Sequence, residues 1–318
     1  MARITIVTPT GAGTRTGNLH TAQRYARFLR SAGHEVRVAL QWAGGACDLL
    51  VALHARRSSE SVEKFKASRK APVVLVLTGT DLYRDLPASK EARRSLALAD
   101  RLIVLQEDAR RKVLKAARRK TRVVYQSSSA AVRHRPPKDR FRVIVVGHLR
   151  DEKDPLRAVS AFSLLKERNL ELIQLGAALD PKYEALAKQW MKRDTRYRWL
   201  GSVPHAQALG WIARSHVLVV SSAMEGGANV ICEAARIGTP VLGSRMSGNV
   251  GMLGKGYPGM FRVFDEKGLA KLIQKLSREK RFYAKLKKTL QARRHLFAPA
   301  AERASLNRVV REALKSRS

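Results

Sequence analysis

Two glutamates that flank a pair of glycines form the pattern in this sequence that could most clearly do chemistry. Glu225 and Glu233 are separated by seven residues, and Gly226 and Gly227 follow the first acid. Carboxylates accept hydrogen bonds from vicinal hydroxyl groups, and glycines let the backbone approach a ligand closely. A helical segment begins at Asn229, a predicted N-cap, and its free N–H groups and partial positive charge suit a diphosphate. The spacing predicts a nucleotide-sugar site, but it fits equally well an ordinary strand, loop and helix with solvated acids.

The segments around this pattern have the hydropathy of elements that could hold it in place. Residues 217–220 are an apolar run typical of a buried strand, and a second apolar strand is predicted after Gly238 and Pro240. Strand and helix patterns alternate from residue 4 onward, which predicts an α/β fold with parallel sheets covered by helices on both faces. The predicted strands include residues 4–7, 36–40, 48–53, 73–77, 102–105, 123–125, 143–146 and 172–175.

Residues 130–140, with the sequence AAVRHRPPKDR, interrupt this periodicity with two prolines and several charges. We interpret the segment as a linker. A chain of 318 residues is long enough for two domains that each have a core of their own. We therefore predict an N-terminal domain over residues 1–134 and a C-terminal domain over residues 141–298, which close about the linker.

The charge balance is unusual, with 62 basic and 26 acidic residues and a net charge of +36. Such a charge attracts polyanions, including nucleic acid and anionic membranes. However, the Lys and Arg residues are spread over the predicted helices, opposite the apolar stripes, and the few aromatic residues are not interleaved with them as a stacking surface would require. We therefore expect solvated helix faces and no specific nucleic-acid partner.

Other features of the composition limit the class of protein. Cys47 and Cys232 are the only cysteines and lie in or beside apolar elements, so we expect small buried residues and not a disulfide. No cluster of His and Cys has the spacing of metal ligands, so we expect no metal. No apolar run reaches the length of a membrane span, and the N-terminus enters a strand without a leader segment. We expect a cytoplasmic protein.

A glycine-rich loop follows the first predicted strand. It is not a P-loop, because no Gly-Lys-Ser/Thr follows, and its third glycine comes one position late for a dinucleotide fingerprint. The second strand also lacks the acid that would bind an adenine ribose, so a dehydrogenase is disfavoured. The loop could bind an acceptor or a phosphate-like anion, or could equally be a plain tight turn. Its candidate acceptor-binding residues are Thr10, Gly11, Arg15 and Asn18.

Polar residues follow the third and fourth predicted strands. His54 ends one strand and is followed by Arg56 and Arg57, and residues 78–81 end the next. Active sites of open parallel sheets lie at the carboxyl ends of strands, so both segments should face one crevice. A lone histidine after a strand is more often structural, but two adjacent motifs favour a functional role. We predict His54 and Asp81 as catalytic residues, no role for His20, His205 and His216, and acceptor binding by Arg56, Arg57, Thr78, Gly79 and Thr80.

The stretch SSAMEGGANVICEAARIGTPV resembles the donor-binding segment of GT-B glycosyltransferases of the family-4 type. The resemblance implies two Rossmann-like domains facing a central cleft, with a final helix over residues 299–318 that returns to the first domain. It also implies that Glu225 is a catalytic residue that contacts the transferred sugar, that Glu233 contacts the ribose, and that the diphosphate lies against Gly226, Gly227, Ala228 and Asn229, with Ser222 also in the donor site.

The loop GHLRDEK at residues 147–153 resembles the phosphate loop of the same enzymes. Lys153 occupies the lysine position and Gly147 the glycine position, whereas the usual arginine is replaced by His148, and Arg150 lies two residues on. Whether Arg150 takes over that role is open. Arg150 and Lys153 would neutralise the charge that develops on the UDP leaving group, which makes a metal dispensable.

Further motifs are similar to the selenosugar synthases of selenoneine biosynthesis, notably LHARRS, TGTDLYR, EGGANV and SGNVGML. That family joins the sugar of a UDP-sugar, typically UDP-N-acetylglucosamine, to selenium from selenophosphate. The resemblance implies that Arg15, Arg56, Arg57 and the 78–81 loop bind the anionic acceptor, with no permanently bound cofactor. Two alternatives stay open: a family-4 glycosyltransferase with a hydroxyl acceptor, and a non-enzymatic binder of polyanions.

Overall fold

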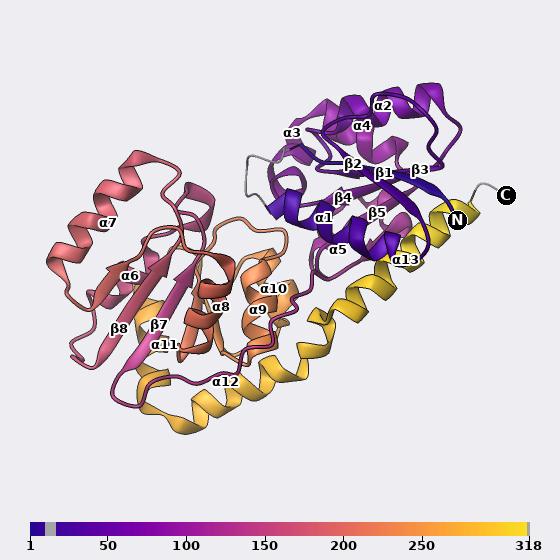
Figure 1. The fold of residues 1–318 in the computed structure, drawn as a ribbon. Helices are drawn as coiled ribbons and strands as arrows, with labels where there is room; N and C mark the ends of the chain where they lie inside the picture. The colour runs from indigo at the N-terminus through magenta and orange to yellow at the C-terminus, as the bar shows by residue number, and fades with distance from the viewer. Residues whose placement is uncertain (10–16, 317–318) are drawn as a thin grey trace. The chain divides into compact units, whose positions relative to one another are not determined.

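The structure is a computed structural model that describes residues 1–9 and 17–316. The chain divides into two compact units, one formed by Met1–Gln126 together with Pro299–Ser318 and the other by Ser127–Ala298 (Figure 1). The first domain predicted from the sequence ends later, at residue 134, and the second begins at residue 141. These boundaries stay a prediction.

The first unit is built on a six-stranded parallel sheet with the order β2-β1-β3-β4-β5-β6. Its strands are β1 (Arg3–Val7), β2 (Glu35–Ala39), β3 (Leu49–Leu53), β4 (Val73–Leu77), β5 (Arg101–Val104) and β6 (Thr121–Val123). Its α-helices are α1 (Gly17–Arg30), α2 (Ser59–Ser68), α3 (Leu86–Ala88), α4 (Lys90–Leu98), α5 (Ala109–Lys112) and α13 (Pro299–Lys315). Two hydrophobic clusters form the core: α1 and α13 pack on one face of the sheet, and α2 and α4 on the other.

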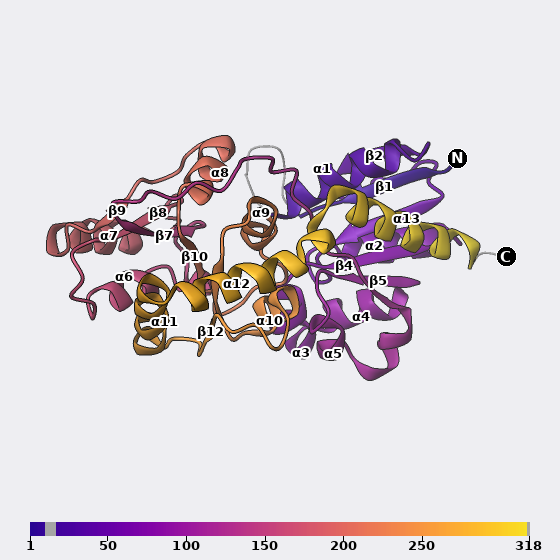
Figure 2. The ribbon, with the colours of Figure 1, turned by 90° about the horizontal axis from the view of Figure 1, so that it is seen from below.

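The second unit has a six-stranded parallel sheet with the order β12-β11-β10-β7-β8-β9 (Figure 2). Its strands are β7 (Phe141–Val146), β8 (Leu170–Leu175), β9 (Tyr197–Trp199), β10 (Val217–Val220), β11 (Val241–Ser244) and β12 (Met260–Phe261). Its α-helices are α6 (Arg157–Phe162), α7 (Pro181–Arg193), α8 (His205–Ala213), α9 (Asn229–Ile237), α10 (Ser247–Leu253), α11 (Glu266–Arg278) and α12 (Lys280–Ala292). The predicted α/β class with two Rossmann-like parallel sheets is confirmed.

Both sheets contain a point at which the order of the strands reverses. In the first sheet, β1 pairs with both β2 and β3. In the second sheet, β7 pairs with both β8 and β10, and the chain builds outward from β7 in both directions. The loops that leave neighbouring strands at such a point diverge and create a crevice at the carboxyl edge, where α/β proteins bind ligands. The loops after β7 and β10 are therefore the ones to inspect in the second unit.

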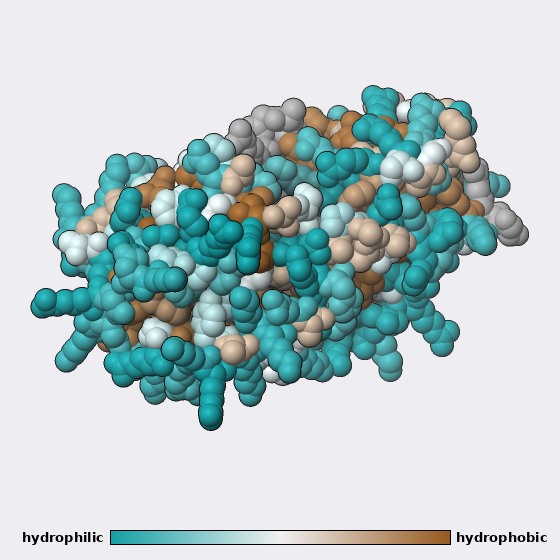
Figure 3. All heavy atoms as spheres, turned by 60° about the horizontal axis from the view of Figure 1, so that its bottom comes forward, coloured by the Kyte–Doolittle hydropathy of each residue, from teal (hydrophilic) through white to brown (hydrophobic). Residues whose placement is uncertain are grey.

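The basic side chains lie largely on the solvated faces of helices. Lys285 and Lys288 on α12 are exposed, whereas Leu286 and Leu290 on the same helix are buried. Hydrophilic side chains predominate on the face in Figure 3. Within residues 1–9 and 17–316, no helix combines the length and the apolar character that crossing a bilayer requires.

The last helix, α13, supplies both apolar and charged contacts to the first unit. Leu306 and Val310 are fully buried in the same cluster as Tyr25 and Leu29 of α1. Glu302 is buried too, and its two carboxylate oxygens accept hydrogen bonds from Arg24 Nε at 2.9 and 2.8 Å. The side chain of Arg24 is itself largely buried, so each charge depends on the other for compensation.

Replacing Glu302 by Ala should therefore destabilise the protein, because Arg24 would remain as a buried charge without its carboxylate. We expect a loss of about 3 kcal/mol in the free energy of unfolding of this unit, measured by urea denaturation. Arg303→Ala, at the exposed neighbouring position, should change it by less than about 0.5 kcal/mol. Equal effects of the two substitutions would contradict a structural role for the buried pair.

Candidate active site

The loops after β7 and β10 meet at the carboxyl edge of the second sheet, because these strands are neighbours in the sheet. The hydroxyl group of Ser221 donates to the carbonyl oxygens of Lys153 at 3.0 Å and of Asp154 at 2.9 Å. The backbone N–H groups of Ala223 and Met224 both bond to the carbonyl oxygen of Glu152, at 2.9 and 3.2 Å. These hydrogen bonds fix the position of one loop relative to the other.

An ion pair joins the side chains of the same two loops. Lys153 pairs with Glu225, and their side chains are 22% and 14% exposed. The structure thus brings together the lysine predicted to bind the diphosphate and the acid predicted to bind the transferred sugar. The two side chains face each other at a sheet edge and are still reached by solvent. A ligand that carries both phosphate and hydroxyl groups could therefore separate them, with the phosphate binding the cation and the hydroxyl groups binding the carboxylate.

The backbone around Glu225 packs against α10. A Cβ atom at Gly248 would lie 2.0 Å from the carbonyl oxygen of Glu225, so only glycine permits this close approach. The buried side chain of Asn249 donates from Nδ2 to the hydroxyl oxygen of Ser244 at 2.9 Å, and that hydroxyl group donates to the carbonyl oxygen of Ser222 at 2.5 Å. Gly248 and Asn249 belong to the SGNVG motif, but the sequence alone assigned them no supporting role.

The helix α9 begins next to this ion pair. The prediction that Asn229 is the N-cap is wrong: Ala228 is the N-cap residue, with an extended backbone, and Asn229 is the first helical residue. No side chain caps this helix, and the N–H group of Ala228 bonds to the sulfur of Met252 at 3.0 Å. Because the N–H groups of a first helical turn have no intrahelical acceptor, the start of α9 is suited to an anionic ligand.

The second glutamate, Glu233, lies one turn into α9 and has a partner that the sequence did not predict. Its Oε1 atom is 2.9 Å from Nε2 of His205, the first residue of α8. The carboxylate is mostly buried, whereas the side chain of His205 is 70% exposed. The hydrogen bond to Glu233, assisted by its negative charge, raises the pKa of His205 above its ordinary value. Only tertiary packing of α8 on α9 brings these two residues together.

The start of the phosphate loop depends on a close backbone approach between β7 and β8. Gly176 has a φ of +136°, and a Cβ atom there would lie 2.0 Å from the carbonyl oxygen of Gly147. The Nδ1 atom of His148 accepts a hydrogen bond from the N–H group of Ala177 at 3.2 Å, and burial lowers the pKa of His148. The ring of His148 is thus held by the backbone, whereas the side chain of Arg150 is half exposed.

In the first unit, Asp81 lies at the carboxyl edge of the sheet and is fully buried. Its Oδ1 atom accepts hydrogen bonds from the N–H groups of Thr78, Gly79 and Leu82 at 2.7–3.0 Å, and its Oδ2 atom accepts one from Ala55 at 3.0 Å. All of these donors are backbone groups of the protein. The contacts join the loops after β3 and β4, and the catalytic role of Asp81 stays a prediction.

His54 is also engaged at both ring nitrogens. Its backbone has a φ of +75°, an uncommon conformation for a residue other than glycine. Nδ1 accepts from the N–H group of Arg57 at 3.3 Å, so Nε2 carries the proton and lies 3.1 Å from the hydroxyl oxygen of Thr80. Burial lowers the pKa of His54, and the carboxylate of Asp81 opposes this shift. In this arrangement the ring orients Thr80, and the role of His54 as a proton acceptor stays a prediction.

A carboxylate that the sequence did not single out lies beside this histidine. Asp85 is buried, with Oδ2 3.7 Å from His54 Nε2 and 3.0 Å from Arg56 Nε. Arg56 is therefore already paired, while the side chain of Arg57 is exposed. Asn18 is the second residue of α1 and is half-buried. The other predicted residues of the glycine-rich loop, Thr10, Gly11 and Arg15, lie outside the described residues.

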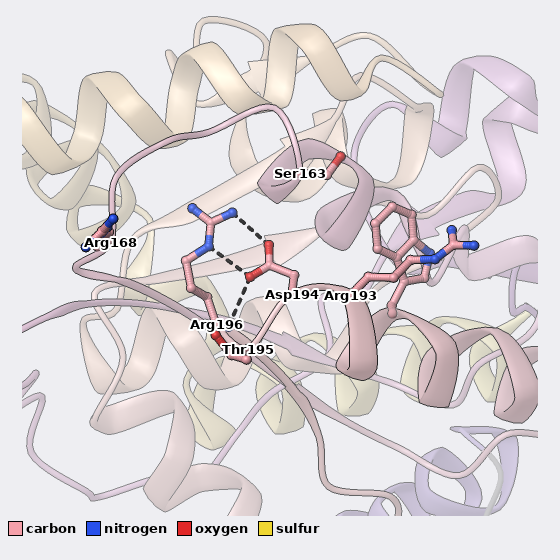
Figure 4. Close-up of a pocket in the computed structure, with 7 residues that line it drawn as sticks. Ser163, Arg168, Arg193, Asp194, Thr195 and Arg196 are labelled. Carbon is pink, nitrogen blue, oxygen red and sulfur yellow. Dashed lines mark hydrogen bonds and ion pairs between the residues drawn. The ribbon is translucent and has the colours of Figure 1, made fainter.

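A cavity of about 640 Å³ lies elsewhere in the second unit, beside the segments that precede β8 and β9. Asp194 and Arg196 form an ion pair at 2.7 Å, and Arg168 and Arg193 lie on opposite sides of the pair (Figure 4). The guanidinium group of Arg196 also donates to three backbone carbonyl groups, so its hydrogen-bonding capacity is used within the protein. The cavity is at the amino ends of the strands and contains none of the predicted site residues.

Across the part of the chain that the structure describes, no group of three or more His, Cys, Asp or Glu side chains is placed to hold a metal ion.

The pair of His205 and Glu233 can be tested by NMR titration. We expect the imidazole of His205 to titrate above about 6.5, the ordinary value for histidine, because its charged form is the better hydrogen-bond donor to the carboxylate. Because the folded-state pKa is the higher one, the pair contributes fully to stability below a pH of about 6.5, and this contribution is lost as the pH rises through the raised value. Glu233→Gln should lower the pKa of His205, whereas Glu184→Gln on α7 should not. An unchanged midpoint in Glu233→Gln would show that the hydrogen bond does not form in solution.

The chain is similar to known proteins both in sequence and in fold. Residues 127–293, more than half of the chain, match the family described as "Glycosyl transferases group 1". The glycosyltransferase 1 domain-containing protein 1 of Xenopus tropicalis is 25% identical over 264 residues, which are 74% of this chain and 76% of that protein. The sucrose-phosphate synthase of Thermosynechococcus elongatus has a similar fold, with a TM-score of 0.80 and 18% identity over 99% of this chain and 100% of that chain. Anabaena HepE, solved in complex with UDP-glucose, matches with a TM-score of 0.79 and 16% identity over 98% of this chain and 100% of that chain.

Proposed function

The chain belongs to the glycosyl transferases group 1 family, and from this premise we propose that it transfers a sugar from a UDP-sugar to selenophosphate. The proposed donor is UDP-N-acetylglucosamine. The new bond joins the anomeric carbon to selenium, the bond from that carbon to the diphosphate breaks, and hydrolysis of the selenium–phosphorus bond then yields a selenosugar, UDP and phosphate. The observation that carries the donor half of this proposal is the pair of Lys153 and Glu225 beside the start of α9.

The contacts around α9 support a UDP-sugar as the donor. The diphosphate would lie against the start of the helix and draw Lys153 away from Glu225, which frees the carboxylate to accept hydrogen bonds from the sugar. Glu233 would accept from the ribose hydroxyl groups, with His205 holding one of its oxygens. The UDP-glucose complex of Anabaena HepE, which has the same fold, supports the choice of nucleotide.

Electrostatic stabilisation of the leaving group would supply most of the rate. Negative charge would develop on UDP as the bond to the sugar breaks, and Lys153, once the diphosphate has drawn it away from Glu225, would stabilise this charge together with the N–H groups of α9. Arg150, half exposed on the same loop, would add a second positive charge. These groups would serve the purpose that a metal ion serves in other transferases.

The acceptor half of the proposal rests on the motifs LHARRS and TGTDLYR, which lie at the carboxyl ends of β3 and β4. Arg57 offers an exposed cation there for an anionic acceptor. His54 and Asp81 are both occupied by contacts within the protein, which suits a nucleophile that is already ionised and needs little help from a general base. A hydroxyl acceptor would need such help. A cytoplasmic location stays an expectation of this proposal.

The acceptor can be identified by incubating the protein with UDP-N-acetylglucosamine and either selenophosphate or a panel of sugar and lipid alcohols. We expect UDP release and a product with the mass of a selenium-bearing sugar only with selenophosphate. Glu225→Ala should lower turnover at least about a hundredfold, because it removes a group that contacts the transferred sugar. Glu184→Ala, on the surface of α7, should have no effect. UDP release with an alcohol and none with selenophosphate would refute the proposed acceptor and favour a conventional glycosyltransferase.

The donor site can be tested separately by titrating UDP into the protein in a calorimeter. Lys153→Ala should weaken UDP binding about tenfold to a hundredfold, because it removes a hydrogen bond between two charged groups. The matched control is Lys188→Ala, an exposed lysine on α7 that also pairs with a glutamate. If Lys153→Ala binds UDP as tightly as the control does, Lys153 does not contact the diphosphate.

A further inference from the structure

Arg157, the first residue of α6, connects the phosphate loop to a segment more than a hundred residues away. Its Nε atom is 2.8 Å from Oδ2 of Asp154, and its Nη2 atom is 3.4 Å from Oδ1 of the same carboxylate. Its Nη1 atom pairs with Glu266, the first residue of α11. The helices α6 and α11 pack side by side (Figure 2). A single guanidinium group therefore bridges two carboxylates from elements that are distant in the sequence.

Asp154 directly follows Lys153 and has an unusual backbone conformation. It ends the turn Asp151–Lys153 in the left-handed region, with φ 45° and ψ 59°. Such a conformation costs free energy in any residue other than glycine, although Asp tolerates it better than most. Its carbonyl oxygen accepts a hydrogen bond from the hydroxyl group of Ser221. The position of this peptide group therefore determines how the phosphate loop lies relative to the loop after β10.

The carboxylate of Asp154 would disturb the donor site if it were not held elsewhere. It is adjacent in the sequence to the lysine that would bind the diphosphate. Released from Arg157, it could compete with Glu225 for Lys153 and would repel the phosphate groups of the donor. The two hydrogen bonds from Arg157 hold this charge on the side of α6 and neutralise it.

The far end of the bridge is also fixed. The side chain of Asp265 caps α11 by accepting from the N–H group of Gly268 at 2.7 Å. Phe264 has a φ of 63°, and its exposed ring lies 5.6 Å from Cζ of Arg157. Two residues in the left-handed conformation, Asp154 and Phe264, thus contact the same guanidinium group. An arginine with one carboxylate on each side and an aromatic ring beside it has little freedom to move.

We propose that Arg157 is a positioning residue for the UDP-sugar: it holds Asp154 in its left-handed conformation and away from Lys153, so that Lys153 faces the donor diphosphate. This inference rests on the proposed function. Arg157 acts through Asp154 and Lys153 and does not contact the donor. The substitutions Arg157→Ala, Asp154→Gly and Lys153→Ala separate this role from a general contribution to folding. Asp154→Gly is informative because glycine adopts the left-handed conformation without strain and carries no carboxylate.

The experiment measures UDP affinity by calorimetry for Arg157→Ala in the wild-type chain and in two backgrounds, Asp154→Gly and Lys153→Ala. In the wild-type chain, Arg157→Ala should weaken UDP binding about tenfold and raise KM for the UDP-sugar with little change in kcat. Arg157→Lys should recover part of the affinity. In the Asp154→Gly background, Arg157→Ala should have no further effect, since the carboxylate through which it acts has been removed. In the Lys153→Ala background its effect should be smaller than in the wild-type chain, because only the repulsion between Asp154 and the donor phosphate groups remains. Arg193→Ala, an exposed arginine at the end of α7, is the matched control.

The results that would overturn the inference are distinct from those that would overturn the proposed function. An equal loss of affinity in all three backgrounds would show that Arg157 acts through Glu266 or through overall stability. If the wild-type chain binds UDP and Arg157→Ala leaves its affinity unchanged, the positioning role is wrong while the donor site stands. If the wild-type chain binds no UDP, the proposed function fails and this inference fails with it.

Discussion

The ion pair of Lys153 and Glu225 is the interaction on which the proposed donor site depends. It forms because β7 and β10 are neighbours in the sheet although seventy residues separate them in the chain. The reversal of strand order between them sends their loops apart at the carboxyl edge, and the hydroxyl group of Ser221 then ties the loops together again. The pair holds opposite charges side by side at this edge, and the proposed chemistry depends on both of them.

The backbone around this pair is held by groups that have no direct part in the proposed chemistry. Gly248 lets α10 lie against the carbonyl group of Glu225, and Gly176 lets β8 end against Gly147. In the first unit, buried Asp81 performs a comparable function with four backbone hydrogen bonds. In both units, residues predicted to act on a ligand are surrounded by others that restrict their motion. Such restriction is what electrostatic stabilisation of a leaving group requires, since charges that are already oriented need no reorganisation.

The sequence predicted the fold well because its signals are local. Alternating apolar strands and amphipathic helices predicted two parallel sheets. The close backbone approaches at Gly176 and Gly248 were not predicted. What it could not predict depends on contacts between distant segments. Asp85 is engaged with His54 only because β3 and β4 are adjacent, and Arg157 meets Glu266 only because α6 packs on α11. The burial of the Asp81 carboxylate among backbone N–H groups was not predicted for the same reason, since spacing does not reveal it. The cap of α9 was misplaced by one residue, because Asn229 already has a helical backbone.

The most direct test of this account is a crystal structure of the protein with UDP bound. We expect the diphosphate to lie at the start of α9 within hydrogen-bonding distance of Lys153, the ribose to contact Glu233, and Lys153 to have left Glu225. Nucleotide bound at any other place, such as the cavity beside Asp194 and Arg196, would contradict the claim that the carboxyl ends of β7 and β10 form the donor site.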